Sequence, residues 1–368
     1  MKFNLKPLGL ASLVVSLPAL FLFITDGKSV PENNIISYVK NLPAQGESSI
    51  EVKLKTPAPA KILQNSYYIS QHFNNCGPAS LSMALSYYGI NKSQEELGEA
   101  LRPYQIPSGD NDDKSVTLDE LASESKKYGL ASYHLPNGNI EKIKLFISYN
   151  IPVITRTWLH VDDDIGHYRV VKGYNDITSE IIQDDSYEGK DLRFSYSDFD
   201  QLWKKFNYEF LVLIPEEKLK IAQAILEEDV DPKIAWQKAV KLSQEELVNN
   251  PDDKYVRFNL SVAYYNVGEY QKSTEEFEKV EYQMPFRTLW YQIEPIKAYY
   301  ELGKFDRVFE ITDRVLNNYN LAFSELYMIR GNIYLKQGNR QTARSEFEQA
   351  VFFNKNMKDA QTALLSVQ

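Results

Sequence analysis

The sequence predicts an α+β domain followed by an all-α array of helical repeats. Between residues 67 and 215, helical patterns come first and strand patterns follow, which is the order typical of an α+β domain. From residue 216 to residue 368 the pattern is helical, and glycines recur at intervals of 35 residues, at Gly268, Gly303 and Gly338. A fixed interval of this length indicates stacked helix pairs.

The first predicted helix of the α+β domain runs from about Pro78 to Tyr88, and Gly89 is the natural stop. Its apolar residues recur with the helical period, at Leu81, Ala84, Leu85 and Tyr88. Pro78 suits the first turn of a helix, where a missing N–H costs nothing. This placement puts Cys76, the only cysteine of the chain, just before the helix.

Two capping boxes predict the next helices. Ser93 with Glu96 starts a helix near 94–101, and Thr117 with Glu120 starts one near 118–128 that Gly129 closes. A further helix is expected over about 140–149. Strands are then predicted at 151–158, 167–174 and 179–183, followed by a helix near 198–205 and an apolar strand at 210–215. The linker Asn175-Asp176-Ile177-Thr178 indicates a hairpin between the second and third strands.

The repeat region resembles tetratricopeptide repeats, most clearly in its third unit. There Gly331, Tyr334, Gly338, Ala343, Phe347 and Ala350 follow the repeat pattern. The second unit departs from it at Pro295 and Ile296. We also expect a degenerate first helix pair over 217–249 and a capping helix at about 357–366. Such repeats stack to bury a continuous core and offer a groove to a protein or peptide partner.

The amino-terminal segment, residues 1–27, is predicted to be a signal peptide or an uncleaved membrane anchor, with the anchor favoured. Lys2 and Lys6 precede an apolar run from Leu8 to Thr25. The positive flank places everything after residue 28 outside the cytoplasm, attached to the membrane through this segment only. Residues 28–66 are predicted to be a spacer, with a short strand favoured around Ile50–Leu54 by alternating polar and apolar residues.

Composition and charge exclude several classes of function. The chain has 368 residues, 25% of them charged, and a net charge of −9. Nucleic-acid binding needs a basic surface, so we exclude nucleic acid as a partner. Because no cysteine and histidine cluster has zinc spacing and no glycine-rich phosphate loop is present, we predict no metal and no other cofactor. The acidic run GDNDDK, residues 109–114, lacks the EF-hand pattern and is predicted to be a solvated loop.

Cys76 is either an inert buried thiol or a nucleophile. A thiol at a helix N-terminus lies among unpaired backbone N–H groups, at the positive end of the helix dipole. That position lowers a thiol pKa and stabilises the reactive thiolate. The N–H of Cys76 can donate one hydrogen bond to an oxyanion, and Gln71 is the candidate for a second donor.

A cysteine nucleophile needs a base, and His167 is the best placed of the four histidines because it opens a predicted strand. His72 is too close in sequence to reach round to Cys76. His160 lies in an acidic turn, where a solvated histidine is the ordinary expectation, and His134 has no supporting context.

The residue that orients His167 follows from the predicted hairpin. If the turn centres on Asp176, His167 lies opposite Asp185, with both side chains on one face of the sheet. A turn displaced by one residue brings Asp184 or Ser186 there instead. We predict Asp185 as the orienting carboxylate and keep Asp184 as the alternative; both residues are also typical of turns.

Together these segments resemble the bacteriocin-processing, double-glycine type of papain-like cysteine peptidase, and especially its stand-alone exported relatives. The segments that carry the resemblance are Q-x4-CGPASLSMAL-x-YYG, HY-x-VVKGY and DDSYEG. The resemblance covers residues 67–215 and implies an α+β papain-like fold. It assigns Cys76 as nucleophile, His167 as base, Asp185 as orienting acid and Gln71 as oxyanion donor.

The chain departs from the family pattern at two places. Gln71 stands five residues before the cysteine where six is usual, and Ser186 follows the aspartate where proline is common. The expected function is an exported cysteine peptidase with a repeat array that binds a protein or peptide. The alternatives are a papain-like acyl or amide transferase, a papain-like domain that binds peptides without turnover, and a non-catalytic repeat adaptor.

Overall fold

A computed structural model describes residues 52–104, 115–318 and 320–368. The predicted amino-terminal anchor, most of the predicted spacer and the whole of the acidic run 109–114 lie outside these residues. Within the part of the chain that is described, no helix is long and apolar enough to cross a bilayer. Residues 52–368 pack as one compact unit.

The α+β domain is built on an antiparallel sheet, as predicted. Its strands within the described residues are β1 (Ala60–Ile62), β2 (Ala131–Leu135), β3 (Val153–Trp158), β4 (Gly166–Asn175), β5 (Glu180–Asp185), β6 (Gly189–Ser195) and β7 (Phe210–Ile214). Their order is β2-β7-β3-β4-β5-β6, and β1 pairs with β4. β3, β4 and β7 lie inside the sheet and are almost entirely buried, which explains the continuous apolar run of β7 and means that the charged residues of β3 and β4 are buried as well.

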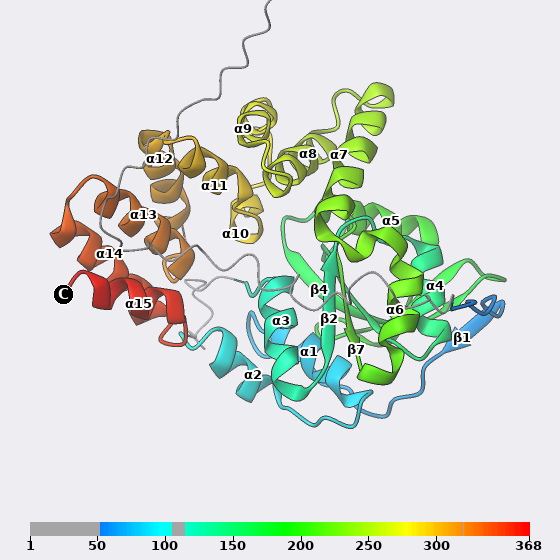
Figure 1. The fold of residues 1–368 in the computed structure, drawn as a ribbon. Coiled ribbons are helices and arrows are strands. Elements are labelled where there is room, and N and C mark those ends of the chain that lie inside the picture. Colours follow the sequence, from blue (N-terminus) through cyan, green and yellow to red (C-terminus); the bar gives the residue numbers. More distant parts are fainter. Residues whose placement is uncertain (1–51, 105–114, 319) are drawn as a thin grey trace, which may run out of the picture. The chain divides into compact units, whose positions relative to one another are not determined.

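Helices cover both faces of this sheet (Figure 1). One core lies between the sheet and α1 (Cys76–Ser86), α2 (Gln94–Leu101) and α3 (Leu118–Ser125). The other lies between the sheet and α4 (Ile140–Ser148), α5 (Tyr196–Trp203) and α6 (Leu219–Leu226). Neighbouring strand residues serve opposite cores, as Val153 and Ile154 show on β3, because side chains alternate along a strand.

The local signals for the helices of this domain are confirmed. Both capping boxes form at the starts of α2 and α3. Gly89 and Gly129 end their segments with φ values of 73° and 79°, a region that favours glycine. One boundary was wrong: α1 begins at Cys76 with Asn75 as its N-cap, so the cysteine is the first residue of the helix and does not precede it.

Three strands, β1, β2 and β6, were not predicted. β6 is a polar edge strand, and β1 has only three residues, so neither carries a clear apolar pattern. β1 lies within the predicted spacer, and its pairing with β4 adds residues 60–62 to the sheet. Of the strand favoured near 50–54, the described residues Val52–Leu54 form none.

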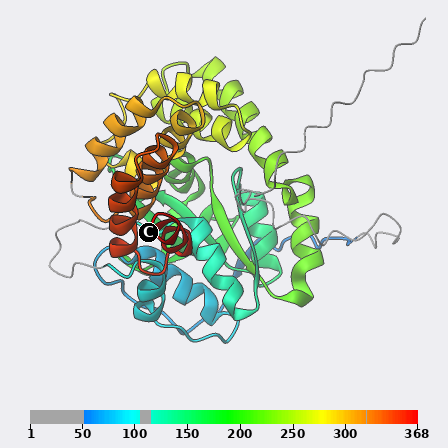
Figure 2. The ribbon, with the colours of Figure 1, turned by 60° about the vertical axis from the view of Figure 1, so that its left-hand side comes forward.

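The second half consists of helix pairs that stack side by side (Figure 2). The pairs are α8 (Lys254–Asn266) with α9 (Tyr270–Glu278), α11 (Glu294–Glu301) with α12 (Phe305–Leu316), and α13 (Ser324–Lys336) with α14 (Arg340–Phe353). Gly268, Gly303 and Gly338 lie between the helices of each pair, all with positive φ. The closing helix is α15 (Lys358–Ser366).

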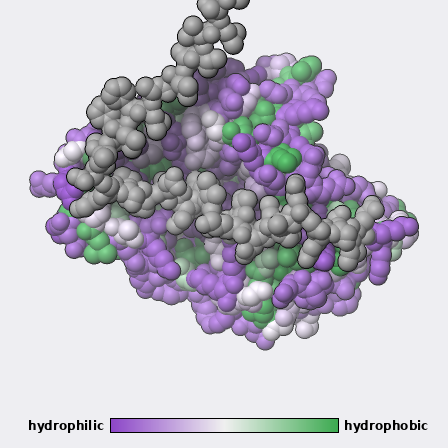
Figure 3. Space-filling view, viewed as in Figure 1, coloured by the Kyte–Doolittle hydropathy of each residue, from purple (hydrophilic) through white to green (hydrophobic). Residues whose placement is uncertain are grey.

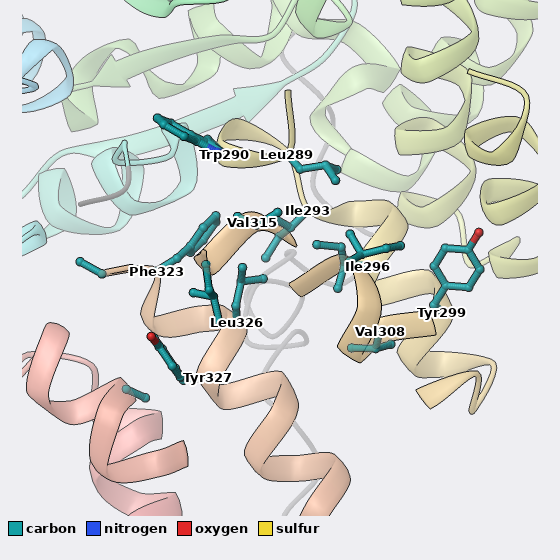
Figure 4. Packing of buried hydrophobic residues seen from close by; sticks show 14 of the residues in the cluster. Leu289, Trp290, Ile293, Ile296, Tyr299, Val308, Val315, Phe323, Leu326 and Tyr327 are labelled. Atoms are coloured by element: carbon teal, nitrogen blue, oxygen red, sulfur yellow. The ribbon is translucent and has the colours of Figure 1, made fainter. Parts of the chain in front are cut away.

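A continuous hydrophobic core runs through these pairs. It includes Ile296, Tyr299, Val308, Leu326 and Tyr327, which come from successive helices (Figure 4). In the third unit Gly331 permits close contact, because a Cβ there would lie 2.4 Å from the ring of Phe347. The small residue of the repeat pattern therefore lets α13 and α14 approach each other.

The predicted first helix pair, 217–249, is not a simple repeat. It contains α6 and α7 (Pro232–Asn249), but Ala222, Ile225 and Leu226 of α6 belong to the core of the α+β domain. The helical half thus begins with a helix that the sheet domain buries. On the face shown in Figure 3, the coloured surface is mostly hydrophilic, with hydrophobic residues in small separate patches.

Candidate active site

Cys76 occupies the first position of α1 and is 4% exposed. The side chain of Asn75, the N-cap residue, makes no capping hydrogen bond to the helix. The N–H groups of Cys76 and Gly77 belong to the first turn, where no intrahelical acceptor exists. The thiol therefore belongs to the first residue of a helix, at the positive end of the helix dipole, and the Tyr168 backbone hydrogen-bonds it.

The loop that leads into Cys76 is held by Gln94 of α2. Its Oε1 accepts hydrogen bonds from the His72 N–H at 2.8 Å and from Asn75 Nδ2 at 2.9 Å. Its Nε2 donates to the Ser70 carbonyl at 2.8 Å. One buried amide thus fixes three points of the loop, which determines where the helix begins.

His167 lies at the start of β4 and is 3% exposed. Its Nε2 is 2.8 Å from Oδ1 of Asp185 on β5. The imidazole also hydrogen-bonds the thiol of Cys76. Because Nε2 contacts the carboxylate, Nδ1 is the ring nitrogen left for the sulfur. The structure therefore brings Cys76, His167 and Asp185 into one hydrogen-bonded chain.

The predicted hairpin register was wrong, although it singled out the carboxylate that contacts His167. Asp185 faces Arg169, two residues along β4 from His167. The turn comprises residues 176–179, which is longer than a turn centred on Asp176, and the pairing shifts again between Val171 and Gly173. Asp185 reaches His167 diagonally, a distance that side chains on one face can span.

Asp184, the alternative carboxylate, makes a different contact. Its Oδ1 lies 2.6 Å from Nζ of the buried Lys172, which also contacts Asp191 at 2.6 Å. Neighbouring strand residues point to opposite faces of the sheet, so Asp184 lies on the face opposite to that of Asp185 and His167. The geometry places Asp185, and not Asp184, beside His167.

Gln71 lies beside the end of β5. Its N–H donates to the Ser186 carbonyl at 2.8 Å, and its side-chain Oε1 accepts a hydrogen bond from the Ser186 hydroxyl at 2.8 Å. Ser186, the residue that replaces the usual proline, thus tethers the predicted oxyanion donor. With Oε1 held in this way, Nε2 is the end of the amide that remains to donate.

The other histidines lie in local ion pairs. His72 is exposed and contacts Glu95 at 3.2 Å. His134 lies between Asp119 at 2.7 Å and Glu209 at 3.2 Å, and His160 between Asp163 and Glu188, each at 2.8 Å. Each of these imidazoles is thus paired with carboxylates and not with Cys76.

The charges of the site favour a thiolate and imidazolium pair. Burial raises the pKa of the Cys76 thiol, but the hydrogen bond and charge of His167, with the charge of Arg102, bring the pKa below its ordinary value. Burial lowers the pKa of His167, whereas Asp185 and Cys76 together raise it to about 9. Burial opposes ionisation of Asp185, but His167 and Arg169 lower its pKa to about 2.

Sequence reasoning missed the two arginines of the site. Nε of Arg169, which is fully buried, lies 2.9 Å from Asp185 Oδ2. Arg102 approaches the Asn75 side chain at 3.4 Å and acts on Cys76 through its charge. The motif HYRVVKGY contained a signal for Arg169, because a charged residue in an otherwise apolar strand needs a buried partner.

Comparisons with known proteins find a similar family for each half of the chain. Residues 63–210 match the sequence model of the peptidase C39-like family, and residues 324–356 match that of the tetratricopeptide repeat. Residues 63–210 form a peptidase C39-like domain. Tetratricopeptide repeats follow it. None of the curated proteins matches the chain.

Solved structures similar to each half complete the comparison. A C39-like peptidase from Bacillus anthracis is 18% identical and matches 43% of this chain and 98% of its own, with a TM-score of 0.37. The peptidase domain of Streptococcus ComA, a bifunctional ABC transporter of a quorum-sensing pathway, is 22% identical over 40% of this chain and 97% of its own, with a TM-score of 0.32. A tetratricopeptide repeat protein from Thermus thermophilus is 19% identical over 36% and 73%, with a TM-score of 0.30.

Proposed function

We propose that this chain is a cysteine peptidase that hydrolyses peptide bonds through Cys76, His167 and Asp185. The observation that carries the proposal is the buried hydrogen-bonded chain of these three side chains at the N-terminus of α1. It lies in a domain that matches the peptidase C39-like family, and it supplies a nucleophile, a base and an orienting carboxylate.

The reaction begins when the Cys76 thiolate attacks a peptide carbonyl carbon and forms a tetrahedral oxyanion. The Cys76 N–H and Gln71 Nε2 are the proposed donors to that oxyanion. The C–N bond then breaks, and protonated His167 gives its proton to the leaving amine. Neutral His167 next takes a proton from water, whose oxygen attacks the thioester carbon. The C–S bond then breaks, which releases the carboxylic acid and restores the Cys76 thiolate beside protonated His167.

The repeat array serves, in this proposal, to bind a protein or peptide partner, which is the general use of tetratricopeptide surfaces. For the amino-terminal segment, we propose that it exports the domain and anchors it outside the cytoplasm. The support is the apolar run from Leu8 to Thr25 behind two lysines.

A peptide-library digest with the full chain in mild detergent tests the proposal. The wild type is expected to cleave a subset of peptides, and Cys76→Ala to cleave none. Cys76→Ser is a matched control, because it keeps the size of the side chain and removes the thiolate. Ligated peptides in place of cleaved ones would instead identify an acyl transferase. If neither product forms, the proposal that this chain is an enzyme would be contradicted.

A further inference from the structure

The second repeat contains a broken helix. The first helices of the neighbouring units, α8 and α13, each have 13 residues. The 35-residue spacing of the glycines predicts a comparable helix at about 289–301, but two short helices are found, α10 (Thr288–Tyr291) and α11. Pro295 lies in the first turn of α11, and a proline inside a helix has no N–H for the carbonyl four residues earlier. That carbonyl belongs to Tyr291.

The α+β domain provides the missing donor. Nη2 of the buried Arg156, on β3, donates to the Tyr291 carbonyl at 2.6 Å. The segment is held on both sides of this bond as well. Arg287 contacts Asp164 at 2.5 Å, and Gln292 Nε2 donates to Glu209 Oε1 at 3.0 Å. Arg156 and Asp164 thus fix α10 against the strand and loop that lead to His167, and Glu209 holds it beside the start of β7 (Phe210–Ile214).

The Tyr291 ring packs on the backbone immediately before His167. A Cβ added to Gly166 would lie 3.0 Å from Cδ1 and Cε1 of this ring. Trp158 and Phe206 hold the other sides of the ring, at centroid distances of 5.7 Å and 6.2 Å. The ring therefore has little room to move, and Gly166 is the residue that lets it approach.

We propose that Tyr291 of the repeat half is a positioning residue for His167, so that the repeat half completes the peptidase site. The inference rests on the proposed function. Tyr291 acts through Gly166: its ring fixes the first residue of β4, and that residue sets where the imidazole meets the Cys76 sulfur.

The electrostatics agree with this placement. Burial raises the pKa of Tyr291 to about 12, a hydrogen bond with the Gly166 backbone opposes the rise, and the charge of Cys76 adds to it. The phenol thus lies close enough to the thiolate for the charge of Cys76 to raise the pKa of Tyr291.

The test measures the rate at which iodoacetamide alkylates Cys76 in the full chain, as a function of pH. This rate reports the thiolate, and hence the contact with His167, without a known substrate. Tyr291→Ala is expected to alkylate about tenfold more slowly at pH 6, the factor that one unit of higher thiol pKa produces. Tyr291→Phe keeps the ring and loses only the hydroxyl that hydrogen-bonds the Gly166 backbone, so its rate is expected to stay within about twofold of the wild type. The matched control is Tyr282→Ala, which removes a tyrosine of the same half that is 79% exposed.

A double-mutant cycle gives a second readout, and its Gly166→Ala arm alone tests the same contact where Tyr291→Ala folds poorly. Gly166→Ala pushes a methyl group into the Tyr291 ring and is expected to slow alkylation, whereas the double variant relieves the clash and is expected to recover part of the rate. Wild-type rates from folded Tyr291→Ala, or additive effects in the cycle, would overturn the proposal for Tyr291. A wild type that alkylates no faster than a free thiol would instead overturn the proposed function itself.

Discussion

At the scale of single residues, Arg169 stabilises the charged carboxylate of Asp185, and that carboxylate in turn orients and charges His167. The carboxylate Oδ1 accepts from His167 and from the N–H groups of Tyr187 and Glu188, and Oδ2 faces Arg169. The sequence predicted Cys76, His167 and Asp185 because their chemistry and spacing are distinctive. It did not predict Arg169, since its role follows from the observed strand register.

We predict that Arg169→Leu removes one of the two cationic partners of the buried Asp185 and leaves only protonated His167. The loss of one partner of a buried ion pair costs about 3–5 kcal/mol of unfolding free energy. The cleavage rate is expected to fall as well, because a less stable carboxylate orients and charges His167 less well. Urea unfolding and peptide cleavage measure the two effects. Arg193→Leu removes an exposed arginine of β6 and should change neither the unfolding free energy nor the cleavage rate. If Arg169→Leu changed neither quantity, the role assigned to Arg169 would be contradicted.

We predict that the cleavage rate falls as pH rises through about 9. The pKa of His167 is raised to about 9, and its protonated form must supply a proton to the leaving amine. The same raised pKa stabilises the fold below the ordinary value of 6.5, and this stabilisation is lost as pH rises through about 9. The measurement is kcat/KM against pH on a peptide from the library. A rate that stays constant to pH 10 would be incompatible with this role.

At the scale of elements, the β4–β5 hairpin decides which carboxylate reaches the site. Helices with capping boxes could be predicted because their signals lie within a few residues. The hairpin register could not, because the turn spans residues 176–179 and the pairing shifts between Val171 and Gly173. The shift lies where Gly173 meets β1: a Cβ there would be 2.8 Å from the Lys61 carbonyl oxygen. That contact is between segments far apart in the sequence.

The hairpin predicts opposite outcomes for two adjacent substitutions. Asp185→Asn should lower the cleavage rate by about tenfold or more, because acid–base catalysis by His167 loses its orienting charge. Asp184→Asn should lower the unfolding free energy through Lys172 and leave the rate near that of the wild type. Both variants are measured by urea unfolding and peptide cleavage. The reverse pattern would show that the register is misassigned.

At the scale of the whole described unit, the two halves share buried contacts. Arg156 donates to Tyr291, Gln292 donates to Glu209, and Trp158 packs against Tyr291. No local pattern could predict these contacts. Pro295 was the one visible sign, as a departure from the repeat pattern whose structural effect is the separate helix α10.

Because of these contacts, we predict that the halves unfold together. Far-ultraviolet circular dichroism, which is dominated by the helices, and exposure of Cys76 should show the same urea midpoint. Arg156→Met removes the hydrogen-bond donor to the Tyr291 carbonyl and the arginine paired with Glu209. Because these contacts join the two halves, the two urea midpoints should then separate. Separate midpoints in the wild type would contradict the coupling.

The central claim is that Cys76 and His167 form a reactive ion pair, and the pH profile of Cys76 alkylation tests it most directly. The wild type is expected to reach its full rate at a lower pH than an ordinary thiol of pKa 9.0, because His167 lowers the pKa of the Cys76 thiol. In His167→Ala, with folding checked by circular dichroism, the profile should move to pH 9 or above. Superimposable profiles for the two proteins would contradict the account.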